Sequence, residues 1–194
     1  ANTKRTEYVQ ENNERGVKQE VISLKPVYGL GLFFVRDTGL VEQVVIFDYY
    51  DELEEYKSIV KDPEKLENEK SMLATNMQHF LDQEDVRLNN EPTYPKVVDV
   101  EIGFRGDYKH PYIAFFIVFQ GVLRKGLNVY EDRYEPETTE YDYRVYWFFP
   151  SRARVIRADL DVPYSLLNRG RILSFCVKTG TFLRGYERIE FELY

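Results

Sequence analysis

The chain has 194 residues, 30% of them charged, with a formal net charge of −7 at pH 7, two histidines and one cysteine. The lone cysteine excludes an intrachain disulfide, the histidines and cysteine are too few for a zinc site of those ligand types, and the acidic balance lacks the basic footprint of a general nucleic-acid binder. The longest unbroken apolar run, residues 112–119, is far shorter than the ~20 residues of a membrane-spanning helix, so we expect a soluble, cytoplasmic protein with no membrane partner.

The first residues are polar and predict a flexible N-terminal arm over 1–16, which precedes a single domain over 17–194. Apolar and β-branched residues then predict strands at 17–24, 27–35 and 40–49. The four residues Arg36-Asp37-Thr38-Gly39 separate the last two strands. An Asp at the start of a turn and a Gly at its end are typical of a type I turn followed by a left-handed glycine, so we expect a β-hairpin.

The pattern becomes helical at residue 51. Asp51 and Glu54 have the spacing of a capping box, and Asp62-Pro63 pairs a helix-capping residue with a proline at the first helical position. An apolar stripe at helical spacing follows across 63–83, opposite an acidic face. The sequence therefore predicts one helical hairpin near residues 51–84.

Residues 89–95 read as a loop, and the remainder of the chain reads as strands. Alternating or continuous apolar residues predict strands near 98–104, 112–119, 122–130, 141–149, 153–160, 171–178 and 186–193. Turn-length connections between successive short strands are typical of antiparallel sheets. We expect an α+β fold that is mainly antiparallel β, a sandwich or partly closed barrel of about 9–10 strands, with the helical hairpin inserted.

Neither a phosphate loop nor a nucleophile is indicated. Gly29-Leu30-Gly31 begins a dinucleotide-binding pattern, but the sixth position is Phe34 and the segment lies within a predicted strand. The two glycines instead favour a β-bulge or a close approach of another element. Cys176 lies inside a predicted strand with no base placed by any motif, which favours a buried structural cysteine. No catalytic residue and no cofactor is therefore nominated, and whether the protein is an enzyme stays open.

Carboxylates gather in two places where a hard cation could bind. One is the acidic loop within residues 131–142, and the other is the pair Asp159 and Asp161 on one strand face. A solvated loop and an exposed strand face are the simpler interpretations, so no metal is predicted. His79 and His110 are far apart in the sequence, and each is interpreted as structural or solvent-facing.

Aromatic and arginine residues crowd the chain after residue 104, and Tyr, Trp and Arg are the residues that form interface hot spots. The candidate interaction surface comprises Tyr141, Tyr143, Arg144, Trp147, Arg152 and Arg154. An ordinary sheet surface has the same composition, because Tyr favours strands and Arg pairs with Glu across them. Arg152 and Arg154 share a strand face and also suit single-stranded nucleic acid.

Three functions follow as hypotheses. The first is a non-catalytic protein-interaction or self-assembling β-rich domain whose partner is a protein, either this chain or another. The second is a small-ligand-binding protein or enzyme with a cavity between the sheet and the helical hairpin. The third is a weak single-stranded nucleic-acid binder. The high charged fraction beside few Cys, Met and His residues is typical of thermophile proteins.

Overall fold

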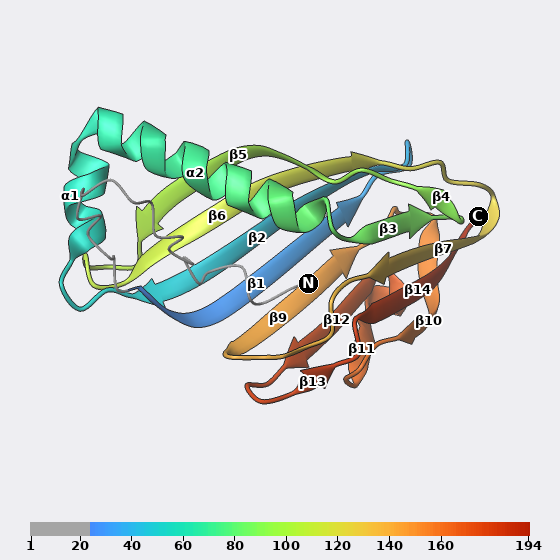
Figure 1. The fold of residues 1–194 in the computed structure, drawn as a ribbon. Coiled ribbons are helices and arrows are strands. Elements are labelled where there is room, and N and C mark those ends of the chain that lie inside the picture. Colours follow the sequence, from blue (N-terminus) through green and yellow to red (C-terminus); the bar gives the residue numbers. More distant parts are fainter. Residues whose placement is uncertain (1–23) are drawn as a thin grey trace.

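The computed structural model describes residues 24–194 as a large and a small β-sheet with two helices on the large one (Figure 1). The large sheet has seven strands in the order β11-β12-β9-β1-β2-β6-β5, and β1 and β9 pair in parallel while the other neighbours are antiparallel. Its strands are β1 (Lys25–Val35), β2 (Leu40–Tyr50), β5 (Lys96–Phe104), β6 (Pro111–Gln120), β9 (Asp142–Phe148), β11 (Tyr164–Leu167) and β12 (Ile172–Val177).

The small sheet has five strands in the order β10-β14-β7-β3-β4, and all of its neighbours are antiparallel. Its strands are β3 (Asp85–Leu88), β4 (Glu91–Pro92), β7 (Gly126–Arg133), β10 (Ala153–Asp159) and β14 (Tyr186–Leu193). Two further short strands, β8 (Glu137–Thr138) and β13 (Phe182–Leu183), pair with each other, and a 3₁₀ turn spans Asn168–Gly170.

The predicted α+β fold with mainly antiparallel sheets is confirmed, and the described residues form no closed barrel. Nine of the strands fall on or close to predicted ones. The described residues contain more strands than the nine or ten expected because β3, β4, β8, β11 and β13 are only two to four residues long. The predicted loop 89–95 contains β4. The predicted arm 1–16 and nearly all of the predicted strand 17–24 lie outside the described residues.

The hairpin between β1 and β2 has the expected turn. The Gly39 amide donates to the Arg36 carbonyl at 2.9 Å, and Gly39 has φ of 83°, in the left-handed region. The two strands then pair over their whole length, with one irregularity between Pro26 and Tyr28. This hairpin forms the centre of the large sheet.

The helical segment contains α1 (Glu55–Lys61) and α2 (Pro63–Leu81), joined by Asp62 alone. The Asp62 side chain accepts from the amides of Glu64 and Lys65 at 3.0 and 3.3 Å, as its sequence predicts. Asp51 and Glu54 form no capping box, because Glu54 adopts φ of 53° and α1 starts only at the next residue. The helices meet at a corner, with α1 turned steeply away from α2 (Figure 1).

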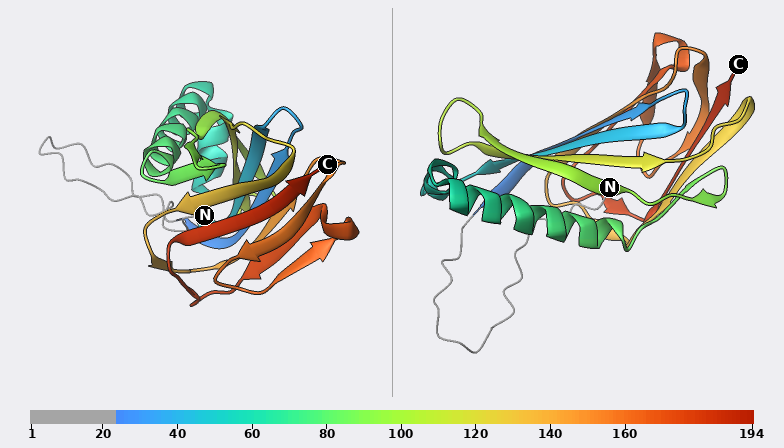
Figure 2. Two further views of the ribbon diagram at one scale, coloured as in Figure 1. Left: turned by 90° about the vertical axis from the view of Figure 1, so that its right-hand side faces the viewer. Right: turned by 90° about the horizontal axis from the view of Figure 1, so that it is seen from above.

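Both helices and the small sheet cover the same, inner side of the large sheet (Figure 2). Alternate residues of β1 and β2, from Phe33 to Tyr49, point to this side and are buried. Under the helices they pack against Leu73, Met77 and Leu81 of α2, and under the small sheet they join a cluster around Trp147. One sheet face therefore organises both parts of the core.

Candidate interaction surface

The described helices and strands leave the outer side of the large sheet uncovered (Figure 2). Many of the side chains on this side are apolar. The strand register aligns its side chains in rows across five strands, from β6 through β2, β1 and β9 to β12. The apolar members are Val118, Phe34, Phe148 and Ile172 in one row, Phe116, Val44, Leu32 and Tyr146 in the next, and Ala114, Ile46 and Leu30 in the third. Apart from the buried Ala114, each is half-buried. We call this set the outer apolar face.

Two aromatic contacts reinforce the outer apolar face. Phe34 of β1 stacks on Phe148 of β9 with ring centroids 5.0 Å apart, and Tyr146 lies 6.5 Å from Phe148. These rings come from strands far apart in sequence that the parallel pairing of β1 and β9 brings together. An antiparallel sheet with one free side normally presents polar residues there, so apolar side chains on both sides require an explanation.

Charged residues on the same face lie toward its ends, and loop cations neutralise three of the carboxylates. The Arg36 Nε donates to Glu42 at 2.6 Å, and the Arg105 Nε donates to Asp48 at 2.9 Å. Lys178 donates to Asp142 at 2.7 Å, and this bond, together with bonds from Thr179, lowers the pKa of Asp142 to about 2. Each of these three ion pairs is therefore close to neutral, although its carboxylate lies on the outer face.

Four further charges lie on this face. Lys96 and Asp99 of β5 share the rows of Val118 and Phe116, and Asp99 lies 3.5 Å from Lys70 of α2. Glu101 of β5 accepts a hydrogen bond from the Tyr112 hydroxyl at 2.7 Å, and this bond is the main reason why the pKa of Tyr112 is raised. Arg144 of β9 lies 3.4 Å from the Ser174 hydroxyl and forms no ion pair within the described part of the chain. The face thus carries an acidic group toward one edge and a cation on the other side of its centre.

The six residues of the predicted interaction surface do not form one surface. Tyr141, Tyr143 and Trp147 are only 3%, 4% and 2% exposed and belong to the core, which corrects their interpretation as surface residues. Strand alternation explains the difference, because odd-numbered residues of β9 point inward and Arg144 points outward. Tyr146 and Phe148, which the predicted interaction surface does not include, are the aromatic residues of β9 on the outer apolar face. The period-two pattern is the signal that could have separated them.

The two remaining predicted residues belong to the other sheet. Arg152 lies in the turn before β10, and Arg154 lies on β10. Arg154 is 3.5 Å from Glu192 and its guanidinium lies 5.1 Å from the centre of the Tyr194 ring. Neither residue adjoins Arg144 in the register of the large sheet.

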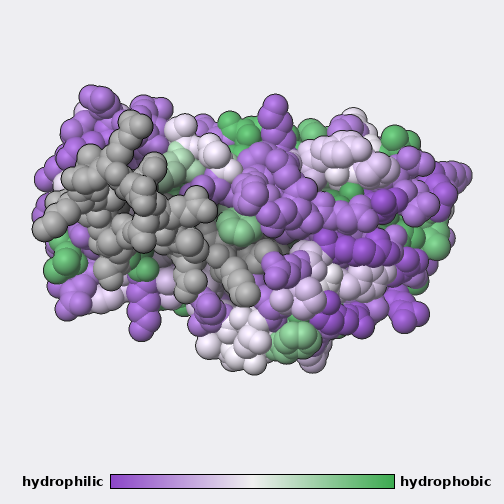
Figure 3. Space-filling model, viewed as in Figure 1, coloured by the Kyte–Doolittle hydropathy of each residue, from purple (hydrophilic) through white to green (hydrophobic). Residues whose placement is uncertain are grey.

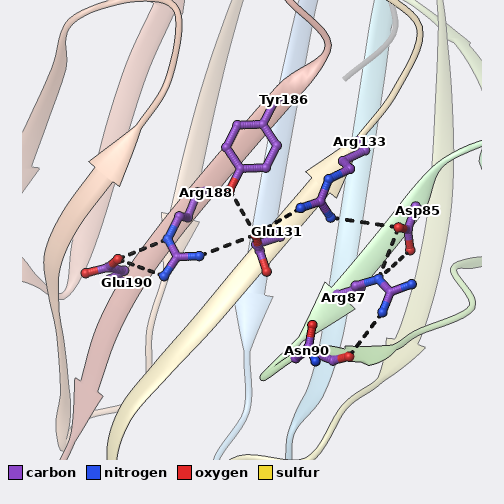
Figure 4. Close-up of polar contacts among 8 residues, drawn as sticks. All are labelled: Asp85, Arg87, Asn90, Glu131, Arg133, Tyr186, Arg188 and Glu190. Carbon is purple, nitrogen blue, oxygen red and sulfur yellow. Dashed lines mark hydrogen bonds and ion pairs between the residues drawn. The ribbon is translucent and has the colours of Figure 1, made fainter.

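The solvent side of the small sheet is a lattice of alternating charges (Figure 4). The Glu131 carboxylate of β7 lies 3.3 Å from the guanidinium of Arg188 and 3.4 Å from that of Arg133. It also accepts a hydrogen bond from the Tyr186 hydroxyl at 2.8 Å. On β3, the Asp85 carboxylate forms an ion pair with Arg87 at 2.8 Å. The face that carries α2 and this sheet is accordingly mostly hydrophilic where it is visible (Figure 3). Cross-strand ion pairing therefore accounts for much of the arginine enrichment in the C-terminal strands.

Among the described residues, neither predicted cation site gathers free carboxylates. One pair of carboxylates already binds an arginine of the protein, and the carboxylates of the acidic loop differ in burial. Asp159 and Asp161 both bind Arg184, the latter at 3.0 Å. In the acidic loop, Asp132 and Glu137 are buried, whereas Glu135 and Glu140 are exposed. Over residues 24–194 no group of three or more His, Cys, Asp or Glu side chains is arranged to hold a metal ion.

The histidines and the cysteine also lie apart from one another. His79 is exposed on α2 with a nitrogen 2.8 Å from the Gln83 amide, and His110 is exposed with a nitrogen 2.7 Å from Asp107. Cys176 is half-buried and lies beside Arg144 on the outer side of β12, so the expectation of a buried cysteine is wrong.

The space between the large sheet and the helices is filled by the apolar core. A cavity of about 20 Å³ lies instead between the two sheets beside the end of α2, and Gln43, Glu84, Asp132 and Glu187 lie among its mostly apolar lining residues. Close by, burial raises the pKa of Tyr130 well above its usual range, and the nearby carboxylates add to the shift. A cavity of this size has room for about one water molecule.

The comparisons with known proteins leave the family open. No family model matches the chain, and no curated protein matches it in sequence. A solved yeast LTA4 hydrolase in complex with bestatin aligns with 7% identity and a TM-score of 0.34 over 86% of this chain and 28% of that chain. A similarity at this level carries no argument about fold or activity. Over residues 24–194 no helix is both long and apolar enough to cross a membrane.

Proposed function

We propose that this protein is a non-catalytic protein-interaction domain that docks through the outer apolar face. The observation that carries the proposal is the alignment of half-buried apolar side chains from β6, β2, β1, β9 and β12 on the side of the sheet that the helices do not cover. Contiguous apolar surface of a few hundred Å² on a water-soluble domain marks interaction sites.

The dimensions of the face suit a protein partner. With about 4.8 Å between strands and about 6.8 Å between alternate residues, the apolar rows across five strands cover about 500 Å². Including the charged flanks across seven strands, the whole side extends to about 900 Å², close to the ~800 Å² that each partner contributes to a standard interface. An apolar centre with a polar rim is the usual composition of such interfaces.

The two other hypotheses have less support. Ligand pockets have volumes of about 300 Å³ or more, whereas the cavity between the sheets measures about 20 Å³. A single-stranded nucleic-acid site needs cations that are available to phosphates, but Arg154 faces Glu192 and Arg188 faces Glu131 and Glu190, which leaves few arginines of this sheet, such as Arg157, for phosphates. Both functions rank below protein docking.

The test compares Leu32→Lys, at the centre of the outer apolar face, with Ile156→Lys on β10, where the native side chain is 48% exposed on the other sheet. We expect the wild type to bind an apolar fluorescent dye at high dilution and to associate as its concentration rises, as seen by sedimentation velocity. Leu32→Lys should lose both properties and Ile156→Lys should keep them. A wild type that neither binds the dye nor associates, or equal loss in both variants, would overturn the proposal.

A further inference from the structure

We infer that the partner of the outer apolar face is a second copy of the same chain, packed sheet against sheet about a two-fold axis parallel to β2. This inference rests on the proposed docking face and adds its occupant and geometry. Its basis is the self-complementary distribution of apolar and charged residues on either side of β2.

One row of the sheet carries the argument. In the register it runs Glu101, Ala114, Ile46, Leu30 and Arg144, on β5, β6, β2, β1 and β9 respectively. Glu101 therefore lies two strands to one side of Ile46, and Arg144 lies two strands to the other side. A two-fold axis over Ile46 exchanges these sides, so Glu101 of each copy faces Arg144 of the other. The dimer thus gains two symmetric ion pairs.

The neighbouring rows are complementary next to the axis, while two strands out Lys96 and Asp99 of β5 face Phe148 and Tyr146 of β9. In the row through Val44, Phe116 lies one strand to one side and Leu32 one strand to the other, so each meets the other across the axis. In the row through Glu42, Val118 meets Phe34 in the same way. The centre of the interface is therefore apolar on both partners, which is where burial stabilises association most.

The acidic residues of β2 do not oppose this arrangement. Glu42 and Asp48 lie on the axis strand, so each faces its own copy. Arg36 and Arg105 already pair with them within each chain, which offsets the like-charge repulsion.

The geometry of stacked sheets accommodates the cross-pair. Aligned sheets pack about 10 Å apart with strands rotated by about 30°, and half of this rotation in each copy displaces Glu101 from Arg144 by about 5 Å along the axis. The long arginine side chain can span this offset. Like Lys96 of β5, Arg144 has no carboxylate partner in the described residues, so pairing need not break an existing bridge.

Charge reversal tests the arrangement. We would measure the dimer dissociation constant of the full chain by sedimentation equilibrium for wild type, Glu101→Arg, Arg144→Glu and the double variant. Each single reversal places two like-charge pairs across the interface and should weaken the dimer about tenfold or more, and the double variant should recover most of the loss. Arg157→Glu on β10 is the matched control, because Arg157 is exposed and has no ion pair within the described residues. Trp147 emission verifies that every variant is folded.

The outcomes separate this inference from the proposed function. A dimer that both single reversals leave unchanged, or that Arg157→Glu weakens equally, overturns the arrangement. A monomeric wild type overturns the second copy, whereas dye binding that Leu32→Lys abolishes would still support a docking face for another protein. If removal of residues 1–23 converts a monomer into a dimer, that segment is the occupant in the intact chain and the inference fails.

Discussion

Phe33 stacks on Trp147 with ring centroids 4.0 Å apart, and their chain neighbours Phe34 and Phe148 stack at 5.0 Å on the opposite side of the same two strands. The parallel pairing of β1 with β9 creates both stacks, because residues that face each other alternate between the two sides of the sheet. The inner stack belongs to the core, and the outer stack belongs to the proposed docking surface.

We therefore expect a mutation in the inner stack to lower mainly the stability of the fold, and a mutation in the outer stack to weaken mainly self-association. Phe33→Ala should destabilise the fold by about 3–5 kcal/mol because it leaves a cavity beside Trp147. Phe34→Ala should cost less than half as much, since the ring is half-buried, but should weaken self-association. Urea unfolding followed by the emission of Trp147, the sole tryptophan, measures the first effect, and sedimentation measures the second. Equal stability losses would contradict the assignment of the stacks to core and surface.

The second prediction compares alanine substitutions at Gly29 and Gly31, the two glycines of β1. A Cβ at Gly29 would lie 3.0 Å from the Tyr143 Cβ, whereas a Cβ at Gly31 would meet its nearest neighbour, Phe33, at an ordinary 3.5 Å. Gly29→Ala should therefore destabilise by about 1–3 kcal/mol through overpacking. Gly31→Ala should be neutral or stabilise by up to about 1 kcal/mol, because alanine restricts the unfolded chain. Chemical denaturation of both variants checks the contrast, and the reverse order would refute it.

Much of the fold was predictable because its long strands have strong local patterns. The hairpin around Gly39 and the helix start at Asp62 follow from residue types within a few positions of each other. Short strands were missed for the same reason, since two to four residues hold too little periodicity. Asn89 and Asn90 did carry a signal, because asparagines tolerate the left-handed region that both adopt in the tight turn between β3 and β4.

The outer apolar face depends on information that no local pattern contains. Half-buried residues such as Leu32 and Val44 were visible as members of strands, but their row extends to Tyr146 only because β9 pairs in parallel with β1. That pairing joins segments more than a hundred residues apart. Residue density near Tyr143 and Trp147 suggested a surface, whereas alternation along β9 places these residues in the core.

The ion pair between Asp142 and Lys178 predicts a defined acid response. The pKa of the Asp142 carboxyl is about 2, below its ordinary value of 3.8, because Lys178 and Thr179 hydrogen-bond to the charged form. A lowered folded-state pKa gives a contribution that is fully present above about pH 4 and is lost as the pH falls through about 2. NMR titration of the Asp142 carboxyl carbon should give this low midpoint, and Lys178→Ala should raise it toward 3.8. A midpoint near 3.8 in the wild type would contradict the bond.

The final prediction concerns Asn128, whose fully buried side chain hydrogen-bonds to the segment that leads into β7. Its oxygen accepts from the Arg124 amide at 2.9 Å and from the Asn89 side chain at 2.8 Å, and its nitrogen donates to the carbonyls of Arg124 and Gly126 at 2.7 and 3.0 Å. Asn128→Ala should destabilise the protein by about 1–3 kcal/mol, because these groups lose the partner that the buried amide provides.

Asn128→Asp serves as the isosteric comparison. At neutral pH it places a carboxylate oxygen against the two carbonyls that the amide nitrogen served, so its stability should be no greater than that of Asn128→Ala. Protonation restores a donor, and the deficit relative to wild type should therefore shrink as the pH is lowered. Urea unfolding at neutral and mildly acidic pH measures this change. A deficit for Asn128→Asp that is small and independent of pH would show that the amide nitrogen does not hold the segment.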